Sequence, residues 1–316
     1  MTAYILRRLI MLIPVILIVG IVVFALIHLT PGDPAAVILG DQATPEAVEN
    51  LREQLGLNDP LLVQFIHWFG GVLHFDFGES IFMGEPVTRA LMDRAQPTIL
   101  LTIYALIFQI AIGVPAGVIS AVKHNSIIDR IVTVVAISGA AIPTFFLGIL
   151  LILFFAVRLG WLPSGGYTPL LEDPVLHFKK MLMPAFALGF SSSGLLARLV
   201  RSSMLDVMRE DYVRTALAKG LPMRFVVIRH ALRNALIPAL TVIGTSVGAL
   251  LGGAVVTETV FTIPGMGRLV VQSISRRDYP VIQGAVMVIA MTYVFVNLIV
   301  DVLYVYIDPR VRLGDD

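Results

Sequence analysis

The stretch DYVRTALAKGLPMRFVVIRHALRN, residues 211–234, is interrupted near its middle by Gly220 and Pro222. Both residue types end helices, because glycine readily takes up left-handed backbone and proline lacks an amide hydrogen. The stretch is also basic, with Arg or Lys at regular intervals along its length. We therefore expect a helix, a sharp corner at Gly220, and a second helix over about residues 222–233.

The segment before Gly220 carries a helix-start signal. Ser203 and Asp206 have the S-x-x-D spacing of a capping box, and residues 204–219 contain neither glycine nor proline. The pattern predicts a first helix that ends at Gly220 and presents one partly apolar face. The residues that recur at three- and four-residue steps on this face are Leu205, Met208, Tyr212, Ala216 and Lys219.

The composition around this stretch is that of a membrane protein. The mean hydropathy is +0.87, and 14% of the 316 residues are charged, against about 25% in soluble globular proteins. A formal net charge of +1 argues against a nucleic-acid partner. The absence of cysteine excludes disulfides and thiolate metal sites.

Six apolar runs are long enough to cross a bilayer, whose hydrocarbon core needs about 20 helical residues. The first is too long for a signal-peptide core and no small-x-small cleavage site follows it, so we interpret it as an uncleaved span. The fourth is the weakest, because it is short and interrupted by proline and serines. The six predicted spans are residues 9–29, 98–122, 131–157, 181–197, 236–258 and 280–307.

The distribution of basic residues favours an orientation with both termini in the cytoplasm. In that orientation 14 of the 23 Lys and Arg lie in cytoplasmic segments, and the other nine lie in outside loops, one of which is by far the longest and therefore counts least. The 14 are Arg7, Arg8, Lys123, Arg130, Arg198, Arg201, Arg209, Arg214, Lys219, Arg224, Arg229, Arg233, Arg310 and Arg312.

These features divide the chain into three parts. Residues 1–94 hold the first span and a long extracytoplasmic segment, residues 95–307 hold five spans with the cytoplasmic loop 198–235, and residues 308–316 form a cytoplasmic tail. In the long segment, Thr44 as N-cap, Pro45 at the first helical position and Gly56 as the stop predict a short helix.

The fifth span contains small and hydroxylated residues. Gly244, Gly248 and Gly252 follow one another at four-residue steps and form a face that allows close helix packing, or a surface that slides during transport. Its hydroxyls either hydrogen-bond a peptide-like solute or bond back to carbonyls of their own helix. The candidate residues for the translocation path or gate are Thr241, Thr245, Ser246, Thr257 and Glu258.

No catalytic or metal-binding constellation is visible in the sequence. There is no H-E-x-x-H, no G-x-S-x-G and no P-loop. The chain is therefore not expected to be an enzyme or to hydrolyse ATP itself, and we assign it no catalytic residues, no metal site and no bound cofactor.

The segment RTALAKG, residues 214–220, resembles the E-A-A-x-x-x-G cytoplasmic loop of ABC importer permeases. LTPGDPA, FGES, TETVFTIPGMGRL and IDPRVR are similar to motifs of the dipeptide and oligopeptide group, so the resemblance covers essentially the whole chain. Arg214 and Thr215 replace the general loop's glutamate and first alanine, and Arg233 replaces its proline.

The resemblance implies an all-α, type I importer permease in a bacterial inner membrane. It implies four partners: a second homologous permease subunit, two ATP-binding subunits that carry ATP-Mg, and an extracytoplasmic solute-binding protein. It also implies short peptides as substrate, with glutathione or a nickel complex as alternatives. The residues implied to couple the chain to the ATPase are Asp211, Tyr212, Arg214, Thr215, Ala216, Lys219 and Gly220.

Two other classes of membrane protein remain as alternatives. An ion-coupled secondary transporter needs ionisable groups or broken helices near the bilayer midplane, usually in two related halves. The central thirds of the predicted spans hold almost no charge, and no internal repeat is visible. A structural or assembly protein needs neither the capped cytoplasmic helix nor the glycine face.

Overall fold

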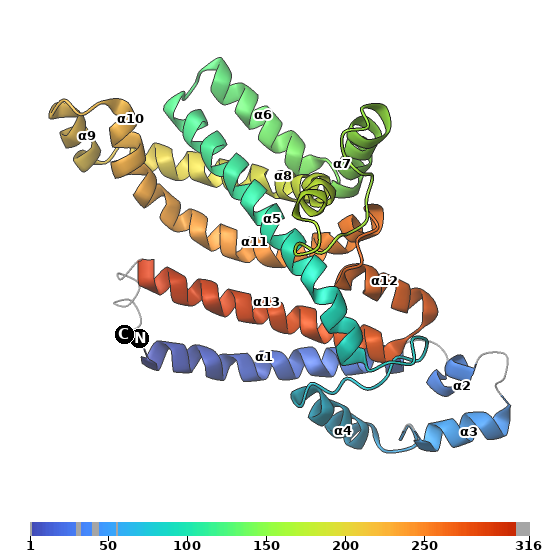
Figure 1. Cartoon of the computed structure of the whole chain (residues 1–316). Coiled ribbons are helices and arrows are strands. Elements are labelled where there is room, and N and C mark those ends of the chain that lie inside the picture. The colour runs from blue at the N-terminus through green and yellow to red at the C-terminus, as the bar shows by residue number, and fades with distance from the viewer. Residues whose placement is uncertain (1, 30–32, 40–43, 55, 308–316) are drawn as a thin grey trace. The chain divides into compact units, whose positions relative to one another are not determined.

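The computed structural model describes residues 2–29, 33–39, 44–54 and 56–307, and the regular elements within them are helices (Figure 1). The predicted tail 308–316, with Arg310 and Arg312, and the side chain of Arg7 lie outside the described residues. The elements are α1 Thr2–Leu29, α2 Pro34–Leu39, α3 Pro45–Gln54, α4 Leu61–Leu73, α5 Val87–Val122, α6 Ile127–Ala141, α7 Thr144–Leu151, the π-helix η2 Ile152–Arg158, α8 Pro174–Val207, α9 Asp211–Ala218, α10 Met223–Phe225, the π-helix η3 Val226–Ala231, α11 Leu232–Val260, α12 Met266–Arg276 and α13 Tyr279–Ile307.

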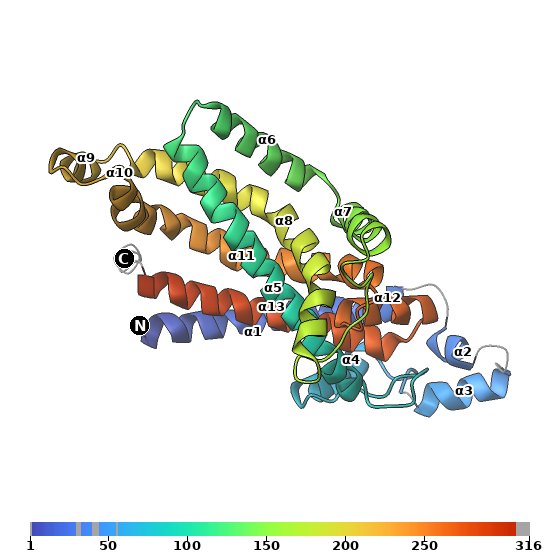
Figure 2. The ribbon, with the colours of Figure 1, turned by 45° about the horizontal axis from the view of Figure 1, so that its top comes forward.

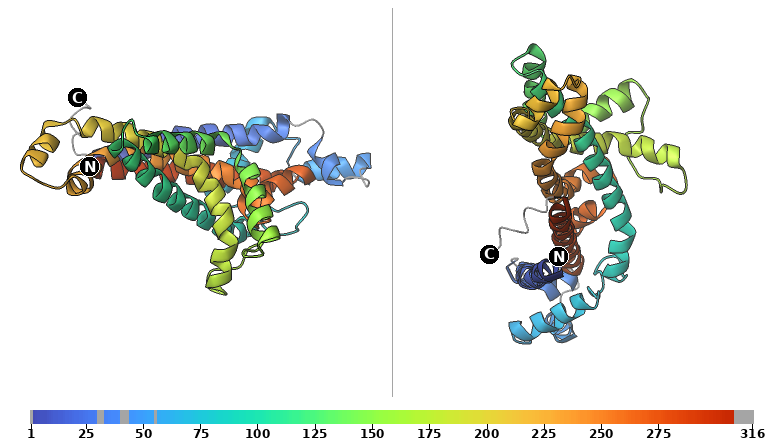
Figure 3. Two further views of the ribbon diagram at one scale, coloured as in Figure 1. Left: turned by 90° about the horizontal axis from the view of Figure 1, so that it is seen from above. Right: turned by 90° about the vertical axis from the view of Figure 1, so that its left-hand side faces the viewer.

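Five helices of the described residues are long and apolar enough to cross a membrane, and the number is six when a bent pair of helices is counted as one span. The bent pair corrects the expected continuous third span over residues 131–157. α6 and the helix Thr144–Arg158 meet at 102° (Figures 1 and 3). The break lies at Ile142 and Pro143, because a residue before proline is driven to extended backbone; Ile142 has a ψ of 123°.

The fourth span, the weakest in the sequence, is a 34-residue helix in the structure, α8. Its mean hydropathy is low because α8 is largely buried inside the protein, where small residues replace large apolar ones. In its most apolar 18-residue stretch, 61% of the residues are buried. A Cβ on Gly189 would stand 2.3 Å from the Ala105 carbonyl oxygen, and one on Gly194 would stand 2.2 Å from that of Ala136. These glycines let α5 and α6 approach the α8 backbone.

The chain divides by its contacts into two compact units, Met1–Gln96 with Arg268–Val294 and Pro97–Gly267 with Phe295–Asp316. In the first unit, α4 packs on α1 through aromatic rings. The ring centroids of Phe24 and Phe65 lie 5.5 Å apart, and those of Phe24 and Trp68 lie 5.9 Å apart.

The first unit also contains the predicted short helix. α3 begins at Pro45, the Thr44 hydroxyl accepts a hydrogen bond from the Ala47 amide at 3.3 Å, and Gly56 has a φ of +65°. The cap and the stop are therefore confirmed. Asp278 is buried in this unit and accepts a 2.5 Å hydrogen bond from the Ser80 hydroxyl.

In the second unit, α5, α8 and α11 run side by side (Figure 2). A core of small and medium apolar side chains, among them Leu101, Leu188 and Leu250, fills the space between them. The opposite face of α5 exposes Ile99, Ile103 and Ile107 at four-residue steps. When a helix buries one face in the core and exposes apolar side chains on the other, the exposed face is typical of a surface that faces lipid.

Candidate functional site

Residues 207–226 form a folded corner around α9, which we call the α9 corner. Val213, Ala216 and Val226 are buried together, and Val207 and Met208 pack against them. Gly220 has a φ of +78°, the left-handed backbone that glycine adopts without strain. The predicted stop at Gly220 is therefore confirmed.

The start of the corner differs from the prediction. α8 continues through Ser203 to Val207, so Ser203 and Asp206 are not a capping box. α9 begins at Asp211, after Glu210 with extended backbone. The helix breaks there because packing Val207 and Met208 against α9 folds the chain back on itself.

The predicted single face and the predicted second helix also need correction. Tyr212 and Lys219 are exposed, whereas Ala216, expected on the same face, is 7% exposed and packs inside the corner. The second helix does not end near Arg233. It continues from Met223 to Val260 as one helical run that includes the fifth span, with a π-helical section at η3.

The outer surface of α9 is polar. Asp211 and Arg214 form an exposed ion pair at 3.5 Å, Thr215 is exposed on the same helix, and Lys219, directly after the helix, is exposed too. The Asn234 side chain donates a 2.7 Å hydrogen bond to the Tyr212 hydroxyl, which fastens α9 to the first turns of α11. The corner is thus internally packed, and its charged side chains are exposed.

At the other end of α11, Glu258 is fully buried. Its carboxylate accepts a 2.6 Å hydrogen bond from Thr98, whose hydroxyl accepts one from the Met266 amide at 2.8 Å. A Cβ on Gly265 would stand 2.2 Å from the Glu258 carboxylate, and one on Gly267 would stand 2.5 Å from a backbone carbon of α11. The turn after α11 therefore closes over Glu258, and in this state the carboxylate presents no surface to a binding protein.

The hydroxyls of α11 fall into two groups. Ser246 and Thr257 are buried and bond back to carbonyls of their own helix at 2.6 and 3.1 Å. Thr241 and Thr245 are exposed, and Thr245 also bonds back, to the Thr241 carbonyl at 3.1 Å. Back-bonding, one of the two expected uses, is therefore present for three of these side chains.

The glycines of α11 are not equivalent. A Cβ on Gly244 would stand 2.2 Å from Val300 of α13, so this residue permits close packing. Gly248 is partly buried, but Gly252 is exposed and has nothing within 4 Å of its Cβ position. A packing role within this chain is thus wrong for Gly252; the close approach occurs one residue later, where Gly253 meets Leu188.

Two buried polar clusters were missed by the sequence interpretation. Asp129 at the start of α6 accepts two 2.8 Å hydrogen bonds from Arg201 of α8 and one from Ser120. Gln109 of α5 is fully buried and donates to Ser246 at 2.8 Å. For Gln109 the available signal was a single polar residue in an apolar run, because an intramembrane polar group needs a partner. Asp129 and Arg201 lie outside the predicted spans and carried no such signal.

No group of three His, Asp or Glu side chains that could hold a metal comes together within residues 2–29, 33–39, 44–54 and 56–307. The polar clusters instead join helices to one another. The distinctive features of the structure are therefore the exposed α9 corner and the closed turn at Glu258.

Sequence models of two related families match nearly the whole chain. The family described as "Binding-protein-dependent transport system inner membrane component" matches residues 113–313, and its N-terminal counterpart matches residues 1–102. The chain belongs to this permease family. It is therefore a multi-pass inner-membrane transport component rather than an enzyme.

Curated relatives of the permease align over its full length. The probable peptide ABC transporter permease protein y4tP of Sinorhizobium fredii is 46% identical over 99% of this chain and 100% of its own. The dipeptide transport system permease protein DppB of Alkalihalophilus pseudofirmus is 44% identical over 99% and 100%. The glutathione transport system permease protein GsiC of Escherichia coli K12 is 43% identical over 99% of both chains.

The fold matches that of a chain in a solved ABC transporter. A chain of the inward-facing MetNI methionine ABC transporter superposes with a TM-score of 0.59 at 19% identity, covering 72% of this permease and 100% of that chain. The likeness shows the fold, and it confirms the expected all-α, type I importer permease class.

Proposed function

We propose that this permease forms half of a translocation path for short peptides in an ATP-driven importer. The observation that carries the proposal is the end-to-end likeness, at 46% and 44% identity, to relatives named for peptide and dipeptide transport. In this proposal the other half is a second homologous permease subunit. Two partner subunits bind ATP-Mg, and an extracytoplasmic solute-binding protein delivers the peptide.

The proposed topology places both termini and the α9 corner in the cytoplasm. The basic residues support it, since eight of them lie in the loop 198–235. Residues 1–94 then form the first span with an extracytoplasmic segment, residues 95–307 the transmembrane domain, and residues 308–316 the tail. The closed turn at Glu258 lies on the extracytoplasmic side.

In the proposed coupling mechanism, the ATPase contacts the exposed charges of α9. Asp211, Arg214 and Lys219 extend outward, while Val213 and Ala216 hold the helix on the corner. Because α9 is packed against its own chain, a movement of the docked ATPase displaces the whole corner as a rigid body. The Tyr212 hydroxyl holds α9 to α11 through Asn234, and Gly220 shapes the turn after α9. Thr215 is exposed and contacts the ATPase.

In the proposed path, the exposed face of α11 contacts the peptide. Thr241 and Thr245 lie on this face, and each hydroxyl oxygen can accept a hydrogen bond from a peptide amide. Gly252 lies on the same exposed face and leaves room beside the solute. Ser246, Thr257 and Glu258 lie behind it, where they shape the helix and the outer gate.

Glutathione is a second candidate substrate, favoured by the 43% identity to GsiC; a nickel complex is the remaining alternative. The decisive experiment is mass spectrometry of the ligand that the cognate binding protein retains on purification, with uptake of that ligand by cells with and without the permease. A di- or oligopeptide supports the proposal. Retention of glutathione or a nickel complex instead contradicts the peptide assignment.

The same cells distinguish an importer from an ion-coupled carrier. We expect the permease, purified in mild detergent, to bring with it an ATPase that contains a P-loop. Uptake that continues after the P-loop lysine of that ATPase is replaced by alanine contradicts ATP-driven import.

A further inference from the structure

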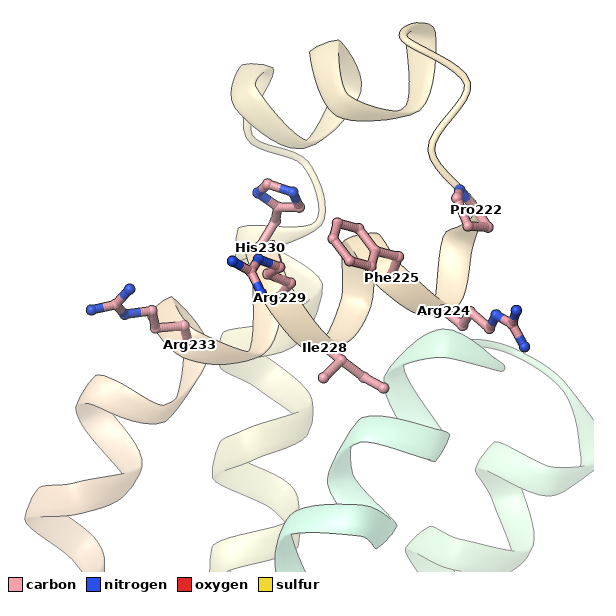
Figure 4. A pocket seen from close by; sticks show the side chains of 7 residues that line it. All are labelled: Pro222, Arg224, Phe225, Ile228, Arg229, His230 and Arg233. Carbon is pink, nitrogen blue, oxygen red and sulfur yellow. The ribbon is translucent and has the colours of Figure 1, made fainter.

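A basic pocket lies where the α9 corner ends, at the start of the helical run Met223–Val260. Its volume is about 940 Å³. The side chains that line it are Pro222, Arg224, Phe225, Ile228, Arg229, His230 and Arg233 (Figure 4). The pocket combines several cations with exposed apolar groups, and this pairing indicates the chemistry of its ligand.

Within the described residues, no carboxylate neutralises the positive charge of the pocket. No carboxylate lines it, and within the described part of the chain Arg224, Arg229 and Arg233 form no ion pair. The Arg229 guanidinium instead lies 5.8 Å from the centre of the Phe225 ring. Three cations that line one cavity without a counter-ion favour the binding of an anion.

The apolar groups of the pocket are exposed. Ile228 is 68% exposed and Phe225 is 41% exposed. In Figure 4, Ile228 points toward the side on which the neighbouring bundle helices lie, whereas Phe225 and His230 point the other way, toward α9.

The sequence places this pocket at a membrane surface. Arg233 precedes the predicted span 236–258 by three residues, or about 5 Å of helix. The headgroup layer extends roughly 5–8 Å beyond the hydrocarbon core on each side. Arg233 therefore falls at headgroup depth, and Arg229 lies one helical turn further out.

We propose that this pocket binds the phosphodiester headgroup of an anionic phospholipid. Arg233 holds the phosphate, and Arg229 and Arg224, which lie further from the bilayer, add to the positive field. The depth of Arg233 favours a lipid over an acidic protein segment. The assignment goes beyond the proposed coupling to an ATPase and does not depend on it.

The test is lipid binding to the full-length permease in a neutral detergent, measured by native mass spectrometry. Phosphatidylglycerol and phosphatidylcholine with identical acyl chains are titrated separately. We expect a preference for phosphatidylglycerol of about tenfold or more, because each basic residue at an anionic surface contributes about fivefold. The double variant Arg229→Gln/Arg233→Gln removes this preference.

The matched control is Arg198→Gln/Arg209→Gln, which removes the same charge from exposed positions of the same loop outside the pocket. It keeps the preference. The wild-type protein provides a test that no folding defect can affect: raising the salt from about 50 to 500 mM reduces the preference for phosphatidylglycerol, since salt screens exposed charges.

Three results would overturn the proposal. The first is equal lipid preference in the wild type and the pocket variant. The second is displacement of bound lipid by millimolar inorganic phosphate, which would make this a site for free phosphate. The third is an unchanged lipid preference with lost retention of the ATPase in the purified complex, which would assign the pocket to that partner.

Discussion

The α9 corner and the turn after α11 both change the direction of the chain at glycine, for opposite reasons. Gly220 has a φ of +78° and open space around its Cβ position, so its role is backbone conformation. Gly265 has the Glu258 carboxylate 2.2 Å from its Cβ position, so its role is to leave room. The first turn is open to another molecule, and the second is closed on the protein itself.

The charges of the two regions follow the same division. Glu258 is fully buried and hydrogen-bonded to Thr98. Asp211 and Arg214 on α9 have side chains that are 96% and 70% exposed. A buried hydrogen-bonded carboxylate stabilises one arrangement of its surroundings, whereas exposed ions contribute little to stability and remain available to a partner. We therefore expect stability effects at the closed turn and functional effects at the open one.

The largest expected effect is at the closed turn. Gly265→Ala places a methyl group against the Glu258 carboxylate, which cannot move away because it is buried and bonded to Thr98. We expect a loss of about 3 kcal/mol in the free energy of unfolding, the upper range for overpacking. Thermal unfolding of the purified protein in detergent measures it.

The matched control for that prediction is Gly252→Ala, which adds the same methyl group to an open position. It should leave the unfolding temperature unchanged or raise it slightly, because alanine favours helix over glycine. Equal destabilisation by both substitutions would mean that room for Glu258 is not the reason for Gly265.

A smaller effect is expected from Thr98→Val. Valine has the same shape but cannot donate to Glu258 or accept from the Met266 amide. We expect a loss of about 2 kcal/mol, since one partner is a carboxylate. Thr102→Val, one turn along α5, is the control, because that hydroxyl bonds back to its own helix. Similar unfolding temperatures for the two variants would mean that the Thr98 hydroxyl does not stabilise the turn over Glu258.

The smallest stability effect is expected at the open corner. Gly220→Ala forces alanine into left-handed backbone at a cost of about 1 kcal/mol, without a steric clash. Gly220→Asn should cost less, because asparagine visits that region more readily. This account predicts the highest unfolding temperature for the wild type, a lower one for Gly220→Asn and the lowest for Gly220→Ala. An unfolding temperature of Gly220→Asn below that of Gly220→Ala would point to a steric clash instead.

Much of the fold could be predicted from apolar run length. The spans and the α3 helix with its Thr44 cap follow from local pattern. The bend at Pro143 was missed because run length ignores a proline inside an apolar segment. The length of α8 was missed because a helix buried among other helices replaces large apolar residues with small ones.

The candidate site was predicted less completely. Gly220 as the corner follows from its chemistry, but the start of α9 depends on packing among Val207, Val213 and Val226, which no local pattern reveals. The burial of Ala216 has the same origin. A substitution such as Ala216→Asp would therefore disturb the packing of the corner rather than test docking alone. The partner of Glu258 could not be found from the sequence, because Thr98 lies 160 residues away.

The central proposal is that an ATPase docks on the exposed charged residues of the α9 corner and transmits its conformational change to the permease through them. Its most direct test is ATP-driven uptake by the reconstituted importer carrying Arg214→Glu/Lys219→Glu, beside Arg198→Glu/Arg209→Glu as a control with equal charge change. We predict uptake reduced more than about tenfold in the α9 variant alone, with an unchanged unfolding temperature, because like charges at an interface cost several kcal/mol. Wild-type uptake by the α9 variant at equal expression would contradict the claim.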